Sequence, residues 1–211
     1  PHPGWSRKPY PLSEYRQAIE PQHIDACDVD IDRLLGADRY EKPDLVPVHT
    51  DEFLHGVKTM YPVTCMESLI GCSIHAGDTS CYAKPVLSDT KLPEEPDSQW
   101  HEIWRHVLER EVELAKGTVP ALQLHLRGVV DMVAAYLGEE RMCFDMFDDP
   151  DGLRRIIERF VRLYKQIARE DSRIRGAWQN GYVSHWGVYA PGVVLDYQVD
   201  ATSILSLAQY D

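Results

Sequence analysis

The sequence predicts an α/β protein in which parallel strands alternate with helices. The first observation is residues 118–138, where a short apolar run from Val119 to Leu126 gives way at Gly128 to a helix-period run that ends at Gly138. This pattern predicts a strand, a tight polar turn and a helix. The second observation is that strand-like and helix-like runs alternate with short connections, which is typical of a parallel sheet covered by helices.

The N-terminal part of the chain predicts an arm followed by one helix. Residues 1–20 are rich in proline and predict an extended arm. Pro21 begins a predicted helix whose apolar residues fall on one face, and Gly36 ends it. We therefore divide the chain into residues 1–60, which form the arm and helix, and residues 61–211, which form the α/β domain.

The α/β domain begins with two short predicted elements and one long one. Residues 61–69 predict a strand, and the Gly- and Ser-punctuated residues 71–87 predict irregular strands or a hairpin. Residues 98–116 predict a helix with a buried apolar stripe, because an Asp-Ser pair can cap its start and a glycine follows its end.

The second half of the domain contains the clearest helix of the sequence. Asp149 is the predicted N-cap of a helix over residues 150–169, with proline at its first position. Residues 176–184 and 193–199 then predict two further strands, and residues 201–211 predict the start of one more helix.

Composition argues against several functional classes. A net charge of −12 and a pI near 5.1 oppose sequence-independent binding of nucleic acid. No stretch approaches the roughly 18 apolar residues of a membrane span. Five cysteines without a CxxC pair predict reduced thiols in a cytoplasmic protein. The aspartates of residues 28–32 lack the Gly and Glu of a calcium loop, and Cys72, His75 and Cys81 fit no standard zinc spacing, so no metal site is predicted.

Four side chains of reactive type come at or near the ends of predicted strands. His125 and Arg127 end the strand of the 118–138 unit, Asp200 ends a later strand, and Glu67 lies near the end of the first. Because the carboxyl ends of parallel strands are where α/β folds build their sites, we expect His125, Arg127 and Asp200 to converge on one cavity. Arg127 offers a bidentate fork for a carboxylate, and a histidine titrates near neutral pH. Simpler interpretations stay open. The arginine could pair locally, the histidine could hydrogen-bond to the backbone, and the two carboxylates could lie in ordinary turns.

A second group of candidates lies on one Gly- and aromatic-rich loop. Its members are Tyr182, His185, Trp186 and Tyr189. Flat rings suit the face of a planar ligand, although aromatic residues also simply fill cores. The loop is therefore either a ligand wall or a packed cover over the site.

Several motifs occur in an order and spacing that resemble a known family. They are HLRGVVDMVAAYLG at 125–138, MFDDPDGLRRIIERFVRLY at 146–164, GYVSHWGVYAPG at 181–192 and VDATSILSLAQYD at 199–211. Together they resemble the uroporphyrinogen decarboxylase (URO-D) superfamily, which includes the methylcobamide:coenzyme M methyltransferases. Residues 5–16 also resemble the N-terminal arm of the decarboxylases through Trp-x-Arg and Leu-x-Glu-Tyr-Arg.

The resemblance implies a fold of the (β/α)8 TIM-barrel type. A complete barrel takes about 250 residues, so this chain would provide only its N-terminal half to two-thirds. A second copy in a homodimer, or a partner chain, would then complete the barrel.

The resemblance also implies roles for the candidate residues. Glu67, in CMESLIG, is the nearest match to the family's catalytic Asp, and His125 and Asp200 would join it as catalytic residues. Arg7, Arg16 and Arg127 would hold substrate carboxylates, and the four aromatic-loop residues would also contact the substrate.

The implied activity is that of a lyase that removes carboxylates from the side chains of a tetrapyrrole, with no certain cofactor. One alternative is a methyltransferase of the same superfamily, which would use a corrinoid and zinc. Another is a non-catalytic half barrel that acts as a binding subunit.

Overall fold

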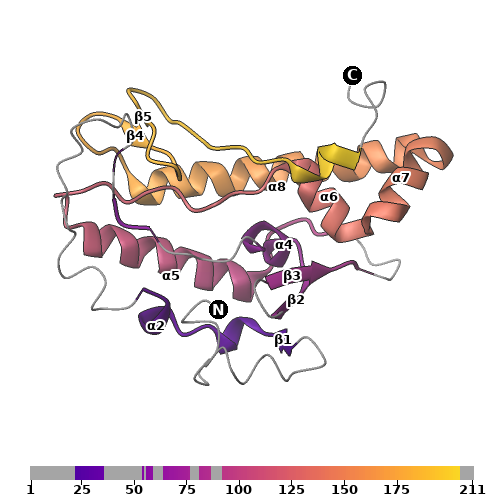
Figure 1. Ribbon diagram of the computed structural model, residues 1–211, viewed down its shortest axis with the longest axis horizontal. Helices are drawn as coiled ribbons and strands as arrows, with labels where there is room; N and C mark the ends of the chain where they lie inside the picture. Colours follow the sequence, from indigo (N-terminus) through magenta and orange to yellow (C-terminus); the bar gives the residue numbers. More distant parts are fainter. Residues whose placement is uncertain are drawn as a thin grey trace.

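The computed structural model describes residues 22–35, 54, 56–58, 64–76, 81–86 and 92–204. The predicted arm and residues 205–211 of the last predicted helix lie outside them. The described part is a mixed α/β structure. Two long helices, α5 (Ser98–Ala115) and α8 (Pro150–Arg175), pack against each other, and shorter helices and two small sheets surround them (Figure 1).

The two long helices confirm the predictions made from their capping residues. The Asp97 carboxylate accepts hydrogen bonds from the backbone N–H groups of Gln99 and Trp100, both at 3.1 Å. Asp149 accepts one from the N–H of Gly152 at 2.9 Å, and proline occupies the first position of α8. These bonds satisfy donors that a helix start leaves unpaired, so the local sequence determines where both helices begin. Helix α8 continues beyond the predicted end to Arg175.

The core lies between these helices and the shorter elements. Trp104 on α5 and Phe160 on α8 are both fully buried. Burial of one such side chain stabilises the fold by about 1.5–3 kcal/mol relative to leaving it in water. No helix among the described residues is long and apolar enough to cross a membrane.

Two consecutive helices follow the central extended stretch, α6 (Val129–Leu137) and α7 (Glu139–Asp148). They meet at Gly138, whose φ of 86° lies in the left-handed region that glycine tolerates. Helix α6 confirms the predicted helix ending at this glycine. The pair packs on α8 and closes one end of the core (Figure 1).

The predicted hairpin of residues 71–87 is confirmed as β2 (Ser73–Ala76) and β3 (Cys81–Lys84), which pair antiparallel. Strand β1 (Gln22–Ile24) joins the other edge of β2, with Gln22 opposite Ala76. The second sheet is the small antiparallel pair of β4 (Tyr182–Val183) and β5 (Tyr189–Ala190).

The helix predicted from Pro21 to Gly36 is wrong for residues 22–30. Residues 22–24 are strand β1, a 3-10 turn follows over Ala26–Asp28, and only α2 (Ile31–Leu35) is α-helical. The reason is partly local, because the Asp28 carboxylate accepts a hydrogen bond from the N–H of Asp25 and stabilises a tight turn. The rest is non-local, because β1 gains its backbone partners from β2.

The predicted strand over residues 61–69 is wrong for its second half. Residues 65–69 form the short helix α4 (Cys65–Leu69), and all five side chains are buried against α5 and α6. An apolar run this short is compatible with either a buried strand or a buried helix, so its periodicity cannot decide between them.

Parallel pairing is present around the extended stretch at residues 119–127. Ala121 pairs in parallel with Val57, and Arg127 pairs in parallel with Gln198. The predicted strands 119–126 and 193–199 are therefore extended segments that pair only through isolated bridges. The predicted strand 176–184 contains β4 and an isolated antiparallel bridge between Trp178 and Gly181. The broad α/β class is confirmed, but the strands of the two described sheets pair antiparallel, so among the described residues the predicted parallel sheet appears only as the two isolated parallel bridges.

Gly128 allows this close approach. Its N–H donates a 2.6 Å hydrogen bond to the carbonyl of Gln198. A Cβ atom at this position would come within 2.4 Å of Val199 Cγ1 and 2.7 Å of Tyr197 Cζ. The absence of a side chain therefore lets residues 197–199 lie directly against the start of α6, where the candidate residues gather.

Candidate functional site

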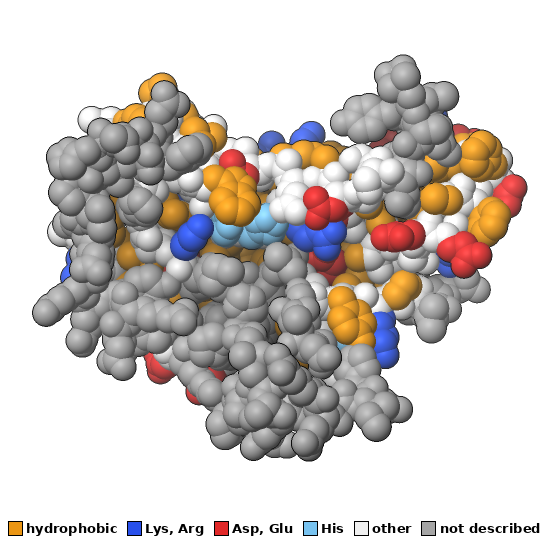
Figure 2. Space-filling view, in the orientation of Figure 1, with side chains coloured by type: hydrophobic (Ala, Val, Ile, Leu, Met, Phe, Trp, Pro, Cys, Tyr) orange, Lys and Arg blue, Asp and Glu red, His pale blue; other side chains and the backbone are white. Residues whose placement is uncertain are grey.

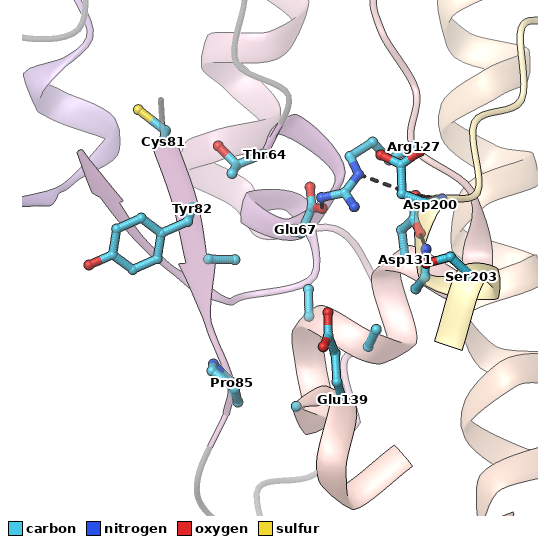
Figure 3. Close-up of a pocket in the computed structure, with 15 residues that line it drawn as sticks. Thr64, Glu67, Cys81, Tyr82, Pro85, Arg127, Asp131, Glu139, Asp200 and Ser203 are labelled. Atoms are coloured by element: carbon cyan, nitrogen blue, oxygen red, sulfur yellow. Dashed lines mark hydrogen bonds and ion pairs between the residues drawn. The ribbon is translucent and has the colours of Figure 1, made fainter. Parts of the chain in front are cut away.

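A cavity of about 440 Å³ opens between α4, β3, α6 and the 3-10 helix Asp200–Ile204. Figure 3 shows Arg127 reaching toward Glu67 on α4, with Asp131 and Asp200 on the opposite wall. The carboxylate of Glu139, at the start of α7, enters from below in that view. Three candidates from the sequence, Glu67, Arg127 and Asp200, therefore line one cavity.

Arg127 bridges two buried carboxylates. Its Nη1 donates to Glu67 Oε1 at 2.7 Å, and its Nε donates to Asp131 Oδ2 at 3.2 Å. The arginine side chain keeps 23% of its surface exposed, whereas both carboxylate side chains have none. The guanidinium thus stands between buried negative charge and the open cavity.

Asp131 joins this cluster to the end of the described chain. It follows Arg127 by one helical turn, the spacing at which opposite charges meet on a helix. Besides Arg127 Nε, its carboxylate accepts the backbone N–H of Ala201 at 2.7 Å and that of Asp200 at 3.2 Å. One carboxylate therefore orients the arginine and anchors the turn that carries Asp200.

Glu67 is the most perturbed acid of the cavity. Burial raises its pKa from the usual 4.5 to about 7, the positive charge of Arg127 opposes that rise, and the nearby Asp131 adds to it. Its Oε2 is buried and has no hydrogen-bond partner among the described residues. Such a carboxyl group can hold or release a proton near neutral pH, as general acid–base catalysis requires.

Asp200 differs from Glu67 because it is exposed. Its Oδ2 accepts a 2.5 Å hydrogen bond from Gln198 Nε2, while its backbone N–H is held by Asp131. The carboxylate therefore sits at the mouth of the cavity, in contact with solvent.

Next to Arg127 lies a cluster of rings. The ring centroid of His125 lies 4.9 Å from that of His185 and 6.2 Å from that of Trp186. His185 Nδ1 is 3.0 Å from the carbonyl oxygen of Gln123, and Lys58 Nζ is 5.4 Å from the Trp186 ring centre. Figure 2 shows histidines at the centre of this face, between side chains of Lys and Arg.

Both histidines are poised to stay neutral. Partial burial lowers the pKa of His125, and the positive charge of Arg127 lowers it further. Partial burial also lowers the pKa of His185. Neutral imidazoles can accept or donate a hydrogen bond without adding charge to the site.

The structure separates the remaining candidates from the cavity. His125 is not among the residues that line it, so the expected meeting of His125, Arg127 and Asp200 holds only for the last two. Tyr182 lies in β4, and Tyr189 in β5 donates its hydroxyl to the carbonyl of Gln179 at 3.0 Å.

Two further arginines cannot be placed, and two polar residues were missed. Arg7 and Arg16 lie outside the described residues. Sequence reasoning missed Asp131 and Gln198. The spacing of four residues between Arg127 and Asp131 was the available signal for the first. Nothing local pointed to Gln198, whose place depends on pairing across the fold.

Metal ligation is not indicated in the described part of the chain, where no group of three or more His, Cys, Asp or Glu could hold an ion. The five cysteines form no disulfide in the described part of the chain. Burial raises the pKa of Cys72 and that of Cys81 to about 12, so both remain thiols at neutral pH.

The cavity residues fall inside the motifs that resemble the URO-D superfamily. Arg127 and Asp131 belong to HLRGVVDMVAAYLG, and Asp200 belongs to VDATSILSLAQYD. No protein-family model, curated protein or solved structure matches the chain. Membership of that superfamily is accordingly a proposal.

Proposed function

We propose that this chain is a URO-D-like enzyme, or the site-bearing part of one, that removes side-chain carboxylates from a tetrapyrrole. One observation carries the proposal. A partly exposed arginine faces a cavity beside a fully buried glutamate, and burial raises the pKa of that glutamate to about 7. The site therefore combines a positive charge that can bind a carboxylate, on the arginine, with a glutamate that can exchange a proton near neutral pH.

Decarboxylation of a pyrrole side chain needs both groups. The carbon–carbon bond to the carboxylate breaks, carbon dioxide leaves, and a proton takes its place on the remaining carbon. Arg127 orients a carboxylate through its planar fork. Glu67 exchanges the proton, and the exposed carboxylate of Asp200 stabilises the cationic ring that forms when the pyrrole is protonated.

The neighbouring rings suit a large planar substrate. Trp186 is 58% exposed, and its ring packs edge-on against those of His185 and His125. A flat macrocycle gains contact area on such side chains, and a cavity of about 440 Å³ falls in the usual range of small-molecule sites. The ring therefore lies over the histidines and Trp186, with one side chain pointing into the cavity.

We extend the proposal to a (β/α)8 barrel that this chain contributes only in part. Its support is the order of the parallel bridges, from Val57 to the 119–127 stretch and on to Gln198. Helices connect these segments along the chain, as successive barrel units require. Just before Gln198 the side chains of Val193 and Leu195 are exposed, so a second copy or a partner chain completes the barrel there.

Ligand titration tests the function. Uroporphyrin and cobalamin are each titrated by absorbance into the wild type, Arg127→Ala and Arg127→Lys. The matched control is Arg154→Ala, because Arg154 is exposed on α8 and does not line the cavity. A charge-assisted contact contributes about 1.5–3 kcal/mol, so Arg127→Ala should weaken uroporphyrin binding roughly tenfold to a hundredfold. Arg127→Lys should recover only part, because lysine lacks the planar fork.

The outcomes separate the alternatives. Carbon dioxide release from uroporphyrinogen that disappears in Glu67→Gln supports the lyase. Binding of cobalamin without uroporphyrin transfers the assignment to the methyltransferase branch. Equal affinity of wild type and Arg127→Ala removes the role given to Arg127.

A further inference from the structure

The geometry points to a site that binds a ligand carboxylate together with one proton. The ligand carboxylate takes the place of Glu67 beside Arg127, and Glu67 takes up the proton. This inference rests on the proposed role of Arg127 as the residue that holds a substrate carboxylate. The inference adds that ligand binding converts Glu67 from an ionised carboxylate paired with Arg127 into a neutral carboxyl group.

The first step is charge balance. Without ligand, Arg127 already contacts the carboxylates of Glu67 and Asp131, both with fully buried side chains. A ligand carboxylate would place a third negative charge around one guanidinium. In a partly desolvated cavity that excess is costly, and a buried acid relieves it by binding a proton.

The second step decides which acid changes. Asp131 accepts two backbone N–H groups in addition to Arg127 Nε, so both of its carboxylate oxygens are already engaged by donors. Among the described residues, Arg127 is the only side chain that donates to Glu67, whose own backbone N–H also interacts with its carboxylate, and its Oε2 has no partner. Protonation therefore sacrifices least at Glu67. The proton can sit on the buried Oε2, which has no hydrogen-bond partner among the described residues, so its uptake displaces no donor.

Other titratable groups around Glu67 do not compete for this role. Burial raises the pKa of Cys65 on the same helix and that of Cys72 just after it, so both keep their protons. The remaining groups face the cavity from the other elements packed around it. They are Cys81 and Tyr82 on β3, Arg127 just before α6, Asp131 in the first turn of α6, Glu139 on α7, and Asp200. Glu139 and Asp200 are exposed, so water screens their charges.

The linkage has a defined pH range. Burial raises the pKa of Glu67 to about 7 in the free protein. Below that pH the proton is already bound and ligand affinity should be flat. Above it each binding event takes up one proton, so affinity should fall about tenfold per pH unit.

Calorimetry measures the proton directly. Uroporphyrin and, as a small probe, succinate are titrated into the wild type at about pH 8 in phosphate and in Tris, which differ in ionisation enthalpy. The difference in observed heat should correspond to uptake of nearly one proton per ligand. At about pH 6 the uptake should approach zero.

Two variants make the test specific. Glu67→Gln keeps the shape but cannot titrate, so its proton uptake should vanish and its affinity should not change between about pH 6 and 8. Glu139→Gln removes an exposed carboxylate from the same cavity and should retain the uptake. Circular dichroism and a thermal melt establish that both variants are folded.

Each outcome has a consequence. Binding without proton uptake in the wild type, or with the same uptake in Glu67→Gln, overturns the inference and leaves the proposed function in place. Succinate binding with uptake, but no uroporphyrin binding, keeps the inference and removes the tetrapyrrole. If neither probe binds the folded protein, both are overturned.

Discussion

Among the described residues, two arginines pair with a fully buried carboxylate one helical turn away, and their surroundings differ. Arg175, at the end of α8, donates from Nε to Asp171 Oδ2 at 2.7 Å and from Nη1 to the carbonyl of Val183 at 2.9 Å. Its side chain is 1% exposed and that of Asp171 is fully buried. Arg127 makes the equivalent contact with Asp131 but keeps a face toward an open cavity.

The difference separates a structural pair from a candidate functional one. Arg175 donates to groups that the fold supplies, and so it fastens the end of α8 to strand β4. Burial raises the pKa of Asp171, and the positive charge of Arg175 opposes that rise. Around Arg127 the same chemistry faces space that a ligand can enter. The accessibility of a buried ion pair is therefore more informative about function than its presence.

The largest expected effect concerns the buried ion pair of Arg175 and Asp171. Arg175→Met should lower the free energy of unfolding by about 3–5 kcal/mol, because it leaves a buried carboxylate and a backbone carbonyl without their partner. Arg127→Met should cost less than about 2 kcal/mol at pH 6, because Glu67 can stay protonated and Asp131 keeps two backbone donors. Urea unfolding at about pH 6 measures both. Equal losses would show that the two pairs are alike in kind.

The helices of both regions could be predicted from the sequence because their signals are local. Asp97 and Asp149 cap helices where their side chains predict them, and Gly138 ends α6. Residues 65–69 were predicted as strand but form helix, and residues 22–24 were predicted as helix but form strand. In both cases burial and pairing with distant residues determine the structure, and neither is visible in a short window.

The candidate site was partly predictable for the same reason. The strand-end rule pointed to Arg127 and Asp200, and both line the cavity. It could not predict that Glu67 would approach Arg127 from a helix rather than a strand. Nor could it predict that His125 would turn toward His185 and Trp186, because that contact joins segments about sixty residues apart.

The second effect is the pH dependence of stability that Glu67, the other carboxylate beside Arg127, should produce. The folded protein holds a proton on Glu67 up to about pH 7, whereas the unfolded chain releases it near 4.5. Below about pH 4.5 both states are protonated, and this contribution is fully present. As pH rises through about 7 it is lost, on the order of 3 kcal/mol in all. Wild type should therefore lose stability relative to Glu67→Gln over this range.

Thermal or urea unfolding of both proteins, at half-unit steps of pH, measures that difference. The lowered pKa values of His125 and His185 act in the opposite direction, since their contribution is lost as pH falls. They are present in both proteins and cancel in the comparison. A difference in unfolding free energy that stays constant with pH would mean that Glu67 is ionised throughout. Glu67 would then not be the proton-binding group that distinguishes the surroundings of Arg127 from those of Arg175.

The smallest expected effect tests how close packing at Gly128 positions the residues around Arg127. Gly128 has φ of −73°, which any residue adopts, so the cost of Gly128→Ala comes only from space. The new methyl group would collide with Val199 and Tyr197 and push residues 197–199 away, at about 1–3 kcal/mol. Because Gln198 and Asp200 move with that segment, ligand binding should also weaken. The control is Gly192→Ala, where a Cβ meets nothing within 4 Å. Unfolding and uroporphyrin titration measure both effects, and a Gly128→Ala protein as stable and as tight-binding as the control would show that the contact between α6 and residues 197–199 does not shape the site.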